Sequence, residues 1–429
     1  MENKSINTYF HSVSLERDAC KGCTNCLKRC PTEAIRVRNG KAKIVKERCV
    51  DCGACIRVCP YHAKKAVTDP FEKINNYKYK IALPAPTLYG QFKMLKNVNL
   101  VLAALKEIGF DEVYDVATGA DLITEATKLY LQRKDVKKPV INSACPAVVK
   151  LIQIRFPNLV DHILPIISPM ECIARVARKE TIKKTGLKSE EIGIFFISPC
   201  AAKMATYISP VGTESTALDG VLSMTEVYAK IAPFLFKQQN VENASKVTSS
   251  GLSWALSGGE TGGLELENSI SVSGIDNVIK VLEEVDDEKL DEVDFVECLA
   301  CVGGCVGGIL AVENSFVASS RIAKLSKTFD NQPVDMGDVK LEDLMFDKEV
   351  EYIPVMSLGK TFKEAMEIMN KRDEIYKNMP RLDCGSCGAP SCEALSEDIA
   401  KGYAKESDCI FKFREKLNFL INEMNQLDE

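Results

Sequence analysis

The chain has 429 residues, of which 46% are hydrophobic and 27% are charged, and its formal net charge is −5. This length is too great for one hydrophobic core and indicates two to four domains. The apolar runs are too short to span a bilayer, which argues against a membrane protein. The basic residues are not interleaved with stacking aromatics, which argues against nucleic-acid binding.

Cysteine dominates the composition, with eighteen cysteines against three histidines. The first ten residues, Met1–Phe10, contain no export signal, so we expect a cytoplasmic protein, in which clustered cysteines bind metal rather than form disulfides. Residues 1–70 carry a net charge of +7, and the remainder carries −12. The basic end either attracts an acidic electron-transfer partner or balances the charge of anionic clusters.

Residues 18–70 contain one four-cysteine unit twice. Each copy has the spacing Cys-x2-Cys-x2-Cys-x3-Cys-Pro. The pattern resembles that of bacterial two-cluster ferredoxins, in which the fourth cysteine of each copy binds the other cluster. The resemblance implies one 4Fe–4S cluster on Cys20, Cys23, Cys26 and Cys59, and a second on Cys49, Cys52, Cys55 and Cys30. Between the copies, residues 34–45 alternate around Asn39-Gly40, which predicts a β-hairpin.

Strand and helix patterns alternate from residue 79 onward. We expect strands at 79–83, 112–116, 140–143 and 192–198, and helices at 99–108, 121–133 and 146–156. This alternation predicts an α/β domain with a largely parallel sheet, within a chain of α+β class overall. Cys145 and Cys200 each follow an expected strand, where ligands gather in such folds.

The segment Glu297–Gly308 holds Cys301 and Cys305 among four glycines. If this segment is helical, the two thiolates face the same way. The glycines then leave room for a bulky metal centre close to the backbone. The alternative is a glycine-rich turn with buried structural cysteines. With Cys145 and Cys200, these cysteines make four candidates for one cluster.

Three segments around these cysteines resemble, in order, the signature segments of FeFe-hydrogenases; they are Ser143–Ala147, Ser198–Lys203 and Glu297–Gly308. Residues 119–122 and 258–263 also resemble that family, and the second stretch lacks the Lys-Ser/Thr ending of a phosphate-binding loop. The resemblance implies an α/β H-cluster domain of two lobes. In it, a 4Fe–4S cluster would be bound by Cys145, Cys200, Cys301 and Cys305. Cys305 would bridge to a diiron unit with CO, cyanide and azadithiolate, and Lys203 would contact a cyanide.

The departures from the family pattern concern proton transfer. Ala144 stands where catalytic members usually have a proton-donating cysteine, and Ser198 and Leu299 stand where they usually have methionine. A general acid typically contributes about 10²–10⁴-fold in rate, so we expect slow turnover with the cofactor retained. Water, Ser198, Cys172 or Cys298 could substitute for the donor. The two cysteines fit better as small buried core residues.

Four further cysteines follow an amphipathic helix that we expect at residues 361–377; they are Cys384, Cys387, Cys392 and Cys409. Their spacing resembles that of the small 4Fe–4S domain of corrinoid iron–sulfur proteins, and zinc is the alternative metal. Apolar residues at helical spacing from 411 to 427 predict a terminal helix, which is either solvated or a dimerisation element.

We therefore expect a two-cluster ferredoxin-like domain at residues 1–70 and an FeFe-hydrogenase-like H-cluster domain at 71–350. A helical linker with a small four-cysteine 4Fe–4S domain would follow at 351–429. The resemblance implies a ferredoxin-type FeFe-hydrogenase that interconverts H2 with protons and electrons. The domain order and Ala144 are most similar to those of the sensory groups.

The resemblance also implies partners. These are a redox partner such as ferredoxin, a signalling kinase or phosphatase, the hydrogenase maturation proteins and, in a homodimer, a second copy. One alternative function is a non-catalytic iron–sulfur scaffold or assembly factor without a diiron site. Another is a ferredoxin-dependent reductase, which the lack of Gly-x-Gly-x-x-Gly after a first strand disfavours.

Overall fold

The computed structural model describes residues 10–93, 95–235, 246–330 and 339–427. The expectation of no export signal concerns residues that lie largely outside these ranges. The chain divides into two compact units. Unit 1 consists of Met1–Val13, Val50–Gly53 and Ala66–Tyr352, and unit 2 consists of Ser14–Cys49, Ala54–Lys65 and Ile353–Glu429.

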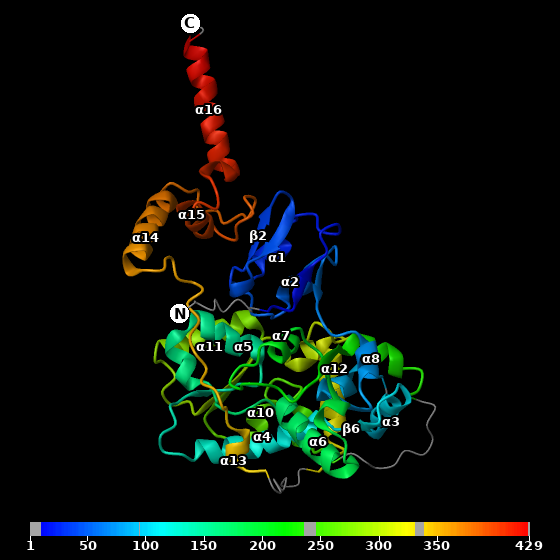
Figure 1. Cartoon of the computed structure of the whole chain (residues 1–429). Coiled ribbons are helices and arrows are strands. Elements are labelled where there is room, and N and C mark those ends of the chain that lie inside the picture. The colour runs from blue at the N-terminus through cyan, green and yellow to red at the C-terminus, as the bar shows by residue number, and fades with distance from the viewer. Residues whose placement is uncertain (1–9, 94, 236–245, 331–338, 428–429) are drawn as a thin grey trace, which may run out of the picture. The chain divides into compact units, whose positions relative to one another are not determined.

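A four-stranded parallel sheet forms the centre of one part of unit 1 (Figure 1). Its strand order is β6 (Glu112–Val113), β5 (Tyr79–Pro84), β8 (Ile192–Ser198) and β9 (Gly220–Ser223). Every residue of β8 is buried, as expected for an inner strand of a parallel sheet with both faces covered. The main hydrophobic core packs around β5 and β8.

A second parallel sheet has three strands, in the order β10 (Ser269–Ser273), β11 (Phe295–Leu299) and β7 (Val140–Ile141). The two sheets agree with the expected α/β class of this region. Helices surround them; they are α3 (Asn99–Glu107), α4 (Val116–Leu131), α5 (Pro146–Arg155), α6 (Pro169–Thr185), α7 (Ala202–Ile208), α8 (Met224–Ile231), α9 (Ser249–Ser253), α10 (Gly259–Leu264), α11 (Ile275–Asp286), α12 (Ser315–Ser326) and α13 (Leu341–Leu344).

One predicted boundary in this region is wrong. The strand expected at 112–116 ends at Val113, and α4 begins at Val116, five residues earlier than expected. Asp115 causes the early start because its side chain caps the helix by accepting a hydrogen bond from the Ala117 amide. The other expected strands and helices agree with the structure to within about two residues.

The ferredoxin-like part of unit 2 contains the predicted hairpin, β2 (Ile35–Arg38) paired antiparallel with β3 (Lys41–Ile44). Asn39 and Gly40 at its turn both have positive φ, which a two-residue hairpin of this kind requires. Two short helices, α1 (Asn25–Lys28) and α2 (Ala54–Arg57), pack against each other. A further small sheet pairs β1 (Val13–Leu15) with β4 (Lys64–Ala66).

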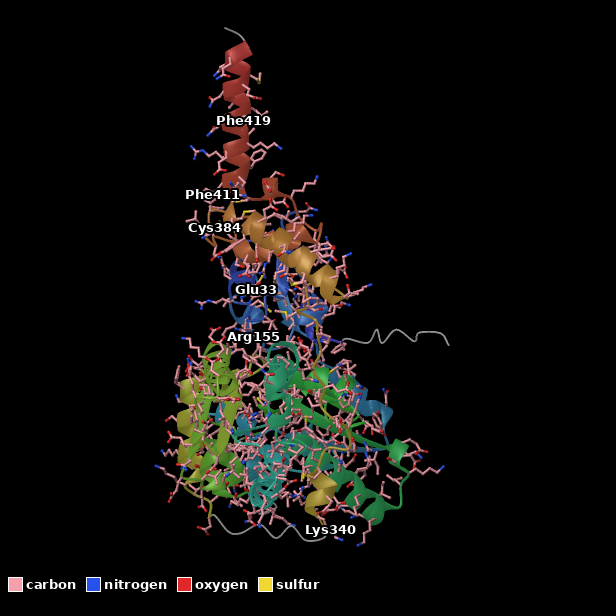
Figure 2. All side chains as sticks on the ribbon, turned by 90° about the vertical axis from the view of Figure 1, so that its left-hand side faces the viewer. Glu33, Arg155, Lys340, Cys384, Phe411 and Phe419 are labelled. Carbon is pink, nitrogen blue, oxygen red and sulfur yellow. The ribbon has the colours of Figure 1, made fainter. Side chains whose placement is uncertain are left out.

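The C-terminal part of unit 2 is helical, with α14 (Phe362–Lys377), α15 (Cys392–Ala400) and α16 (Ile410–Leu427). α14 packs against α15. α16 extends away from both in two perpendicular views, and Figure 2 shows Phe411 and Phe419 along it. Among the described residues, the structure contains no helix with the length and apolar character needed to cross a membrane.

Candidate metal centres

The four cysteines expected to bind one cluster in unit 1 all follow the carboxyl ends of strands. Cys145 comes after β7 and is the N-cap residue of α5, with Pro146 at the first helical position. Cys200 comes two residues after β8 and precedes α7. Cys301 comes two residues after β11, and Cys305 begins a 3-10 turn. In α/β folds, the carboxyl ends of the strands are where ligands bind.

The thiols of Cys145, Cys200 and Cys305 interact electrostatically, so the structure brings these three together. Burial, and then the charges of Cys200 and Cys145, raise the pKa of Cys305 to about 12. Burial also raises the pKa of Cys200. The cysteine side chains are nevertheless only half-buried by exposed area. This combination is expected of thiols that border a space inside the protein, and it suits thiolates that gain a metal as their counter-charge.

The segment with Cys301 and Cys305 is not an α-helix, because a turn at 301–304 leads into the 3-10 turn Cys305–Gly307. Its glycines also have a different role from the expected one. A Cβ on Gly304 would lie 2.7 Å from the backbone of Leu256, and a Cβ on Gly308 would lie 2.3 Å from the Pro199 carbonyl oxygen. These two glycines therefore allow close packing of backbone segments. The contact at Pro199 holds the Cys305 segment against the Cys200 segment.

Lys203 joins the segments that carry Cys145 and Cys200. It lies on α7, and its Nζ donates a hydrogen bond of 3.0 Å to the carbonyl oxygen of Ala144. Its charge opposes the effect of burial on the pKa values of Cys200 and Cys305. Lys203 also lines a pocket together with Ser143. A half-buried ammonium at this position suits an anionic metal ligand.

The structure gives Ser198 a role in the turn. Its hydroxyl donates to the Cys200 carbonyl oxygen at 2.8 Å and accepts from the Cys200 amide at 3.2 Å, and the residue is fully buried. Its proton is therefore engaged by the backbone that positions Cys200. Cys172 lies in a hydrophobic core, where burial raises its pKa to about 12. Neither residue has the surroundings of a proton donor.

The sequence interpretation missed a buried pair of carboxylates beside this site. Glu297 on β11 accepts hydrogen bonds from the Gly258 and Thr261 amides, both at 2.9 Å, and one of 3.1 Å from the Thr261 hydroxyl. The glycine-rich stretch 258–263 thus binds a carboxylate of its own chain, which leaves those amides unavailable to a phosphate.

Glu260 is the second carboxylate of the pair. Its Oε2 accepts a 2.8 Å hydrogen bond from Asn142 Nδ2, and its Oε1 has no hydrogen-bond partner among the described residues. Burial and then the charge of Glu297 raise the pKa of Glu260 far above its ordinary value. Burial, and then the charges of Cys145, Glu297 and Glu260, raise the pKa of Cys298. Glu260, Cys298 and Cys145 therefore form a sequence of interacting titratable groups.

The ferredoxin-like part of unit 2 contains a pocket that the four cysteines expected for its first cluster line together; they are Cys20, Cys23, Cys26 and Cys59. The Ala63 amide donates to Cys59 Sγ at 3.3 Å, and the Ala34 amide donates to Cys30 Sγ at 3.2 Å. The two copies of the repeat thus have matching geometry. Burial raises the pKa of Cys55 to about 12, and Cys30 also acts on it. Cys49 and Cys52 are half-buried.

The four C-terminal cysteines line another pocket in unit 2; they are Cys384, Cys387, Cys392 and Cys409. Cys392 lies at the start of α15, and its amide donates to Asp383 Oδ1 at 2.6 Å. Burial raises the pKa of Cys387, and Cys409 and Cys384 raise it further. Four converging thiolates suit a 4Fe–4S cluster and equally suit zinc.

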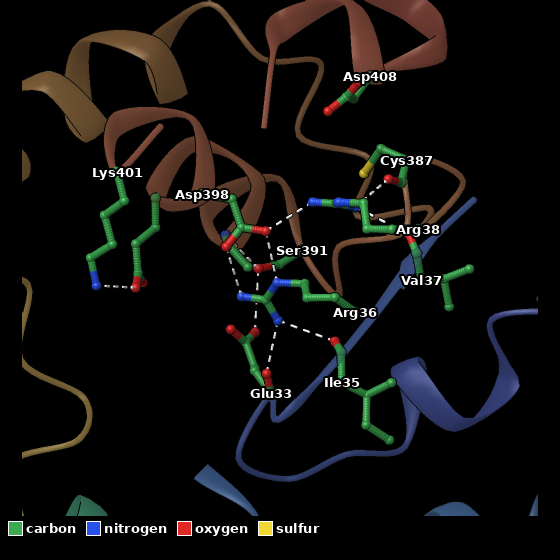
Figure 3. A network of polar contacts seen from close by, with 12 residues as sticks. Glu33, Ile35, Arg36, Val37, Arg38, Cys387, Ser391, Asp398, Lys401 and Asp408 are labelled. Atoms are coloured by element: carbon green, nitrogen blue, oxygen red, sulfur yellow. Dashed lines mark hydrogen bonds and ion pairs between the residues drawn. The ribbon is translucent and has the colours of Figure 1, made fainter. Parts of the chain in front are cut away.

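Direct contacts join the two cysteine-rich parts of unit 2 (Figure 3). Arg36 and Arg38 on β2 both bind Asp398 Oδ2 on α15, at 2.8 and 2.9 Å. The Val37 amide donates a 2.8 Å hydrogen bond to the Gly388 carbonyl oxygen. A Cβ on Gly388 would lie 1.9 Å from the Val37 oxygen, so only glycine permits this approach. The loop with Cys387 is therefore held against the ferredoxin-like hairpin.

Three family models match the chain. The model described as "Iron only hydrogenase large subunit, C-terminal domain" matches residues 78–309. The "4Fe-4S dicluster domain" model matches residues 12–60, and a model for an Fe–S cluster segment matches residues 379–411.

Known proteins are similar over large parts of the chain. The periplasmic Fe hydrogenase large subunit of Nitratidesulfovibrio vulgaris is 25% identical over 70% of this chain and 86% of its own length. Iron hydrogenase 1 of Clostridium pasteurianum is 22% identical over 69% of this chain and 64% of its own length. The NADP-reducing hydrogenase subunit HndD of Solidesulfovibrio fructosivorans is 26% identical, and the match covers 44% of it. The solved structure that revealed stepwise FeFe-hydrogenase H-cluster assembly shares the fold, with a TM-score of 0.50 at 15% identity over 67% of this chain and 97% of that one.

Proposed function

Because this chain belongs to the iron-only hydrogenase large-subunit family, we propose that it converts H2 to protons and electrons at low turnover and acts as a sensor of H2 or of redox state. The observation that carries this proposal is the convergence of Cys145, Cys200 and Cys305 beside Lys203, with Ala144 where a proton donor would stand. The cysteines and the lysine fit the cofactor, whereas the alanine does not fit fast proton transfer.

Each residue of the site has a role in this proposal. Cys145, Cys200, Cys301 and Cys305 would hold a 4Fe–4S cluster, and Cys305 would also bind the diiron unit. When bound, the diiron unit supplies the open metal site at which H2 is cleaved or formed. Lys203 holds the Cys145 segment through the Ala144 carbonyl, and its charge would favour an anionic cyanide ligand of the bound cofactor.

Proton transfer needs another route because the Ala144 side chain has no exchangeable proton. Glu260 and Cys298 are the best candidates, since both are buried and burial raises the pKa of both; Cys298 also interacts with Cys145, and Glu260 interacts with Cys298. Cys298 has a thiol proton, and Glu260 has an oxygen without a hydrogen-bond partner among the described residues. A thiol with a raised pKa, such as that of Cys298, gives up its proton reluctantly. A proton relay through it would therefore be slow, which is consistent with slow turnover.

Electron transfer would use the two ferredoxin-type clusters and the C-terminal cluster. The contacts of Arg36 and Arg38 with Asp398 hold the C-terminal cysteines on the ferredoxin-like hairpin. The C-terminal cluster would therefore exchange electrons with the ferredoxin clusters, and a ferredoxin would be the external partner. A signalling kinase or phosphatase as the receiver, the maturation proteins and a cytoplasmic location stay predictions.

A second copy of the chain would bind along α16. Apolar side chains repeat there at alternating spacings of three and four residues, which is the pattern of a coiled-coil seam, and all are exposed; they are Ile410, Phe413, Leu417, Leu420 and Met424. Lys416 and Glu423 lie on one side of this seam. In an antiparallel pair of helices, each Lys416 faces the other copy's Glu423, so the charges are complementary. This arrangement favours a homodimer.

Infrared spectroscopy of anaerobically matured protein tests the central proposal. We expect absorption bands of bound CO and cyanide, together with H2 oxidation that is slow but measurable. Absence of these bands after maturation would overturn the proposal and favour the alternative, a non-catalytic iron–sulfur scaffold. A rate equal to that of bidirectional hydrogenases would contradict the slow, sensory part alone.

A further inference from the structure

Lys64 is a buried cation in the ferredoxin-like part of unit 2. It lies on β4, only 2% of its surface is exposed, and its Nζ has no hydrogen-bond partner among the described residues. An isolated ammonium is strongly disfavoured in a protein interior unless an opposite charge compensates it. The position of Lys64 therefore requires an anionic neighbour.

The neighbours of Lys64 are cysteines. Lys64 lines the pocket shared by the four cysteines of the first ferredoxin-type site. It also acts on a cysteine of each site: burial raises the pKa values of Cys26 and Cys55, and the charge of Lys64 opposes both rises. A 4Fe–4S cluster on four thiolates is anionic, so bound clusters would supply the missing counter-charge.

The internal repeat shows that packing alone does not require a lysine here. Lys64 follows Ala63, whose amide binds Cys59 Sγ, and the equivalent residue in the first copy is Ile35, which follows Ala34 and its bond to Cys30 Sγ. Ile35 is also 2% exposed. Two positions with the same backbone role and the same burial thus hold an aliphatic side chain in one copy and a charge in the other.

We propose that Lys64 raises the reduction potential of the ferredoxin-type clusters, most strongly that of the cluster whose pocket it lines. One-electron reduction adds one negative charge to a cluster and needs no proton in this step. A fixed positive charge at close range stabilises the reduced form more than the oxidised form, and low solvent access keeps this effect strong. The cluster on Cys20, Cys23, Cys26 and Cys59 is then the first of the two to accept an electron.

This inference rests on the cluster content of the proposed function but not on H2 conversion or on a loaded diiron unit. It is tested on the full-length holoprotein by redox titration monitored by electron paramagnetic resonance, with dithionite as reductant. Lys64→Met removes the charge and keeps the length of the side chain. In this variant we expect the reduction potential of the first ferredoxin-type cluster to fall. The redox equilibrium should change at least tenfold, which is 59 mV for a one-electron couple.

Three control variants separate charge from packing. Lys64→Arg keeps the charge and should retain the wild-type potential. Ile35→Met changes the equivalent residue without changing charge and should leave both potentials unaltered. Lys41→Met removes a nearby cation whose Nζ already donates to the Arg17 and Cys20 carbonyl oxygens, and its effect should be smaller because that cation is partly exposed.

The outcomes distinguish the alternatives. Full iron content with unchanged potentials in Lys64→Met would overturn the inference and leave Lys64 as a packing residue. If that variant loses its clusters, Lys64→Gln takes its place, because glutamine keeps polarity without charge. Full iron content with unchanged potentials in Lys64→Gln would then overturn the inference. Wild-type protein without the two ferredoxin-type signals would instead contradict the cluster assignment in the proposed function.

Discussion

At Ala144, the backbone rather than the side chain makes the contact that organises the site. The carbonyl oxygen accepts the hydrogen bond from Lys203, so a different side chain at this position leaves that contact in place. The cysteines themselves could be identified from the sequence because their spacing and their position after strands are strong signals. Glu260 and Glu297 could not, because a carboxylate in a glycine-rich stretch or a strand has no distinctive spacing. The one sequence signal for this pair is Glu297 itself, because an acidic residue inside an otherwise apolar strand indicates a buried carboxylate.

Replacing Ala144 with cysteine should restore a proton donor. We expect Ala144→Cys to increase the H2 oxidation rate of the matured protein by about 10²-fold, the lower end of the usual contribution of a general acid. Dye-linked activity assays under H2 measure the rate, and infrared spectra verify equal loading of the cofactor. Ala144→Ser is the matched control, because its hydroxyl is a much weaker acid and should give little increase. An unchanged rate in Ala144→Cys would mean that proton transfer at this position does not limit turnover.

Glu260 should make the stability of unit 1 depend on pH. Burial raises its pKa from the ordinary 4.5, so the folded state keeps a proton that the unfolded state releases as the pH rises above that value. The free energy of unfolding therefore falls between mildly acidic and mildly alkaline pH. Glu260→Gln cannot ionise and should lose less thermal stability over this range. Thermal unfolding followed at several pH values measures the difference; parallel curves for the two proteins would contradict the raised pKa.

Elements built on local signals were predictable, and elements fixed by distant contacts were less so. The hairpin follows from Asn39-Gly40, and β8 follows from its continuous apolar run. The conformation at 301–305 did not follow from the spacing of its cysteines, because packing against the backbone at Pro199 and Leu256 decides it. The interaction of β2 with α15 was also not predictable, since nothing in either segment identifies the other.

The ion pairs between β2 and α15 should be important for the stability of unit 2. The Arg36 and Asp398 side chains are only 10% and 11% exposed, so removing Asp398 leaves the buried Arg36 guanidinium without its ion-pair partner. We expect Asp398→Ala to lower the free energy of unfolding by about 3 kcal/mol. Chemical denaturation of the holoprotein measures this change. Glu393→Ala on the same helix is the control, because Glu393 pairs with Arg372 but is mostly exposed and should cost about 0–1 kcal/mol.

At the scale of the whole molecule, α16 is the element whose exposed surface is least like that of an ordinary solvated helix. It has apolar side chains along a seven-residue repeat, and Leu420 is 45% exposed. The helix itself was predictable from its periodicity. Its partner was not, because the same periodicity fits a solvated helix, a helix packed within the chain, and a dimer.

Charge reversal on α16 distinguishes these possibilities. We expect Glu423→Lys to weaken the dimer, because each copy then places a lysine opposite Lys416 of the other copy. The double variant Lys416→Glu with Glu423→Lys should restore it. Sedimentation velocity over a range of concentrations measures the dissociation. Asn418→Lys, which adds a charge away from the seam, should have little effect, and a wild-type protein that stays monomeric at every concentration would contradict the homodimer.

The hydrogen bond of Arg36 to Asp398 spans 362 positions along the chain. Ribosomes add about 5–20 residues per second, so the N-terminal cysteine repeat waits roughly 20–70 s after its own synthesis before its C-terminal partner segment exists. During that interval Arg36 and Arg38 lack the carboxylate that pairs with both of them. The contact between β2 and α15 can therefore form only near the end of synthesis, after the whole of unit 1 has been made.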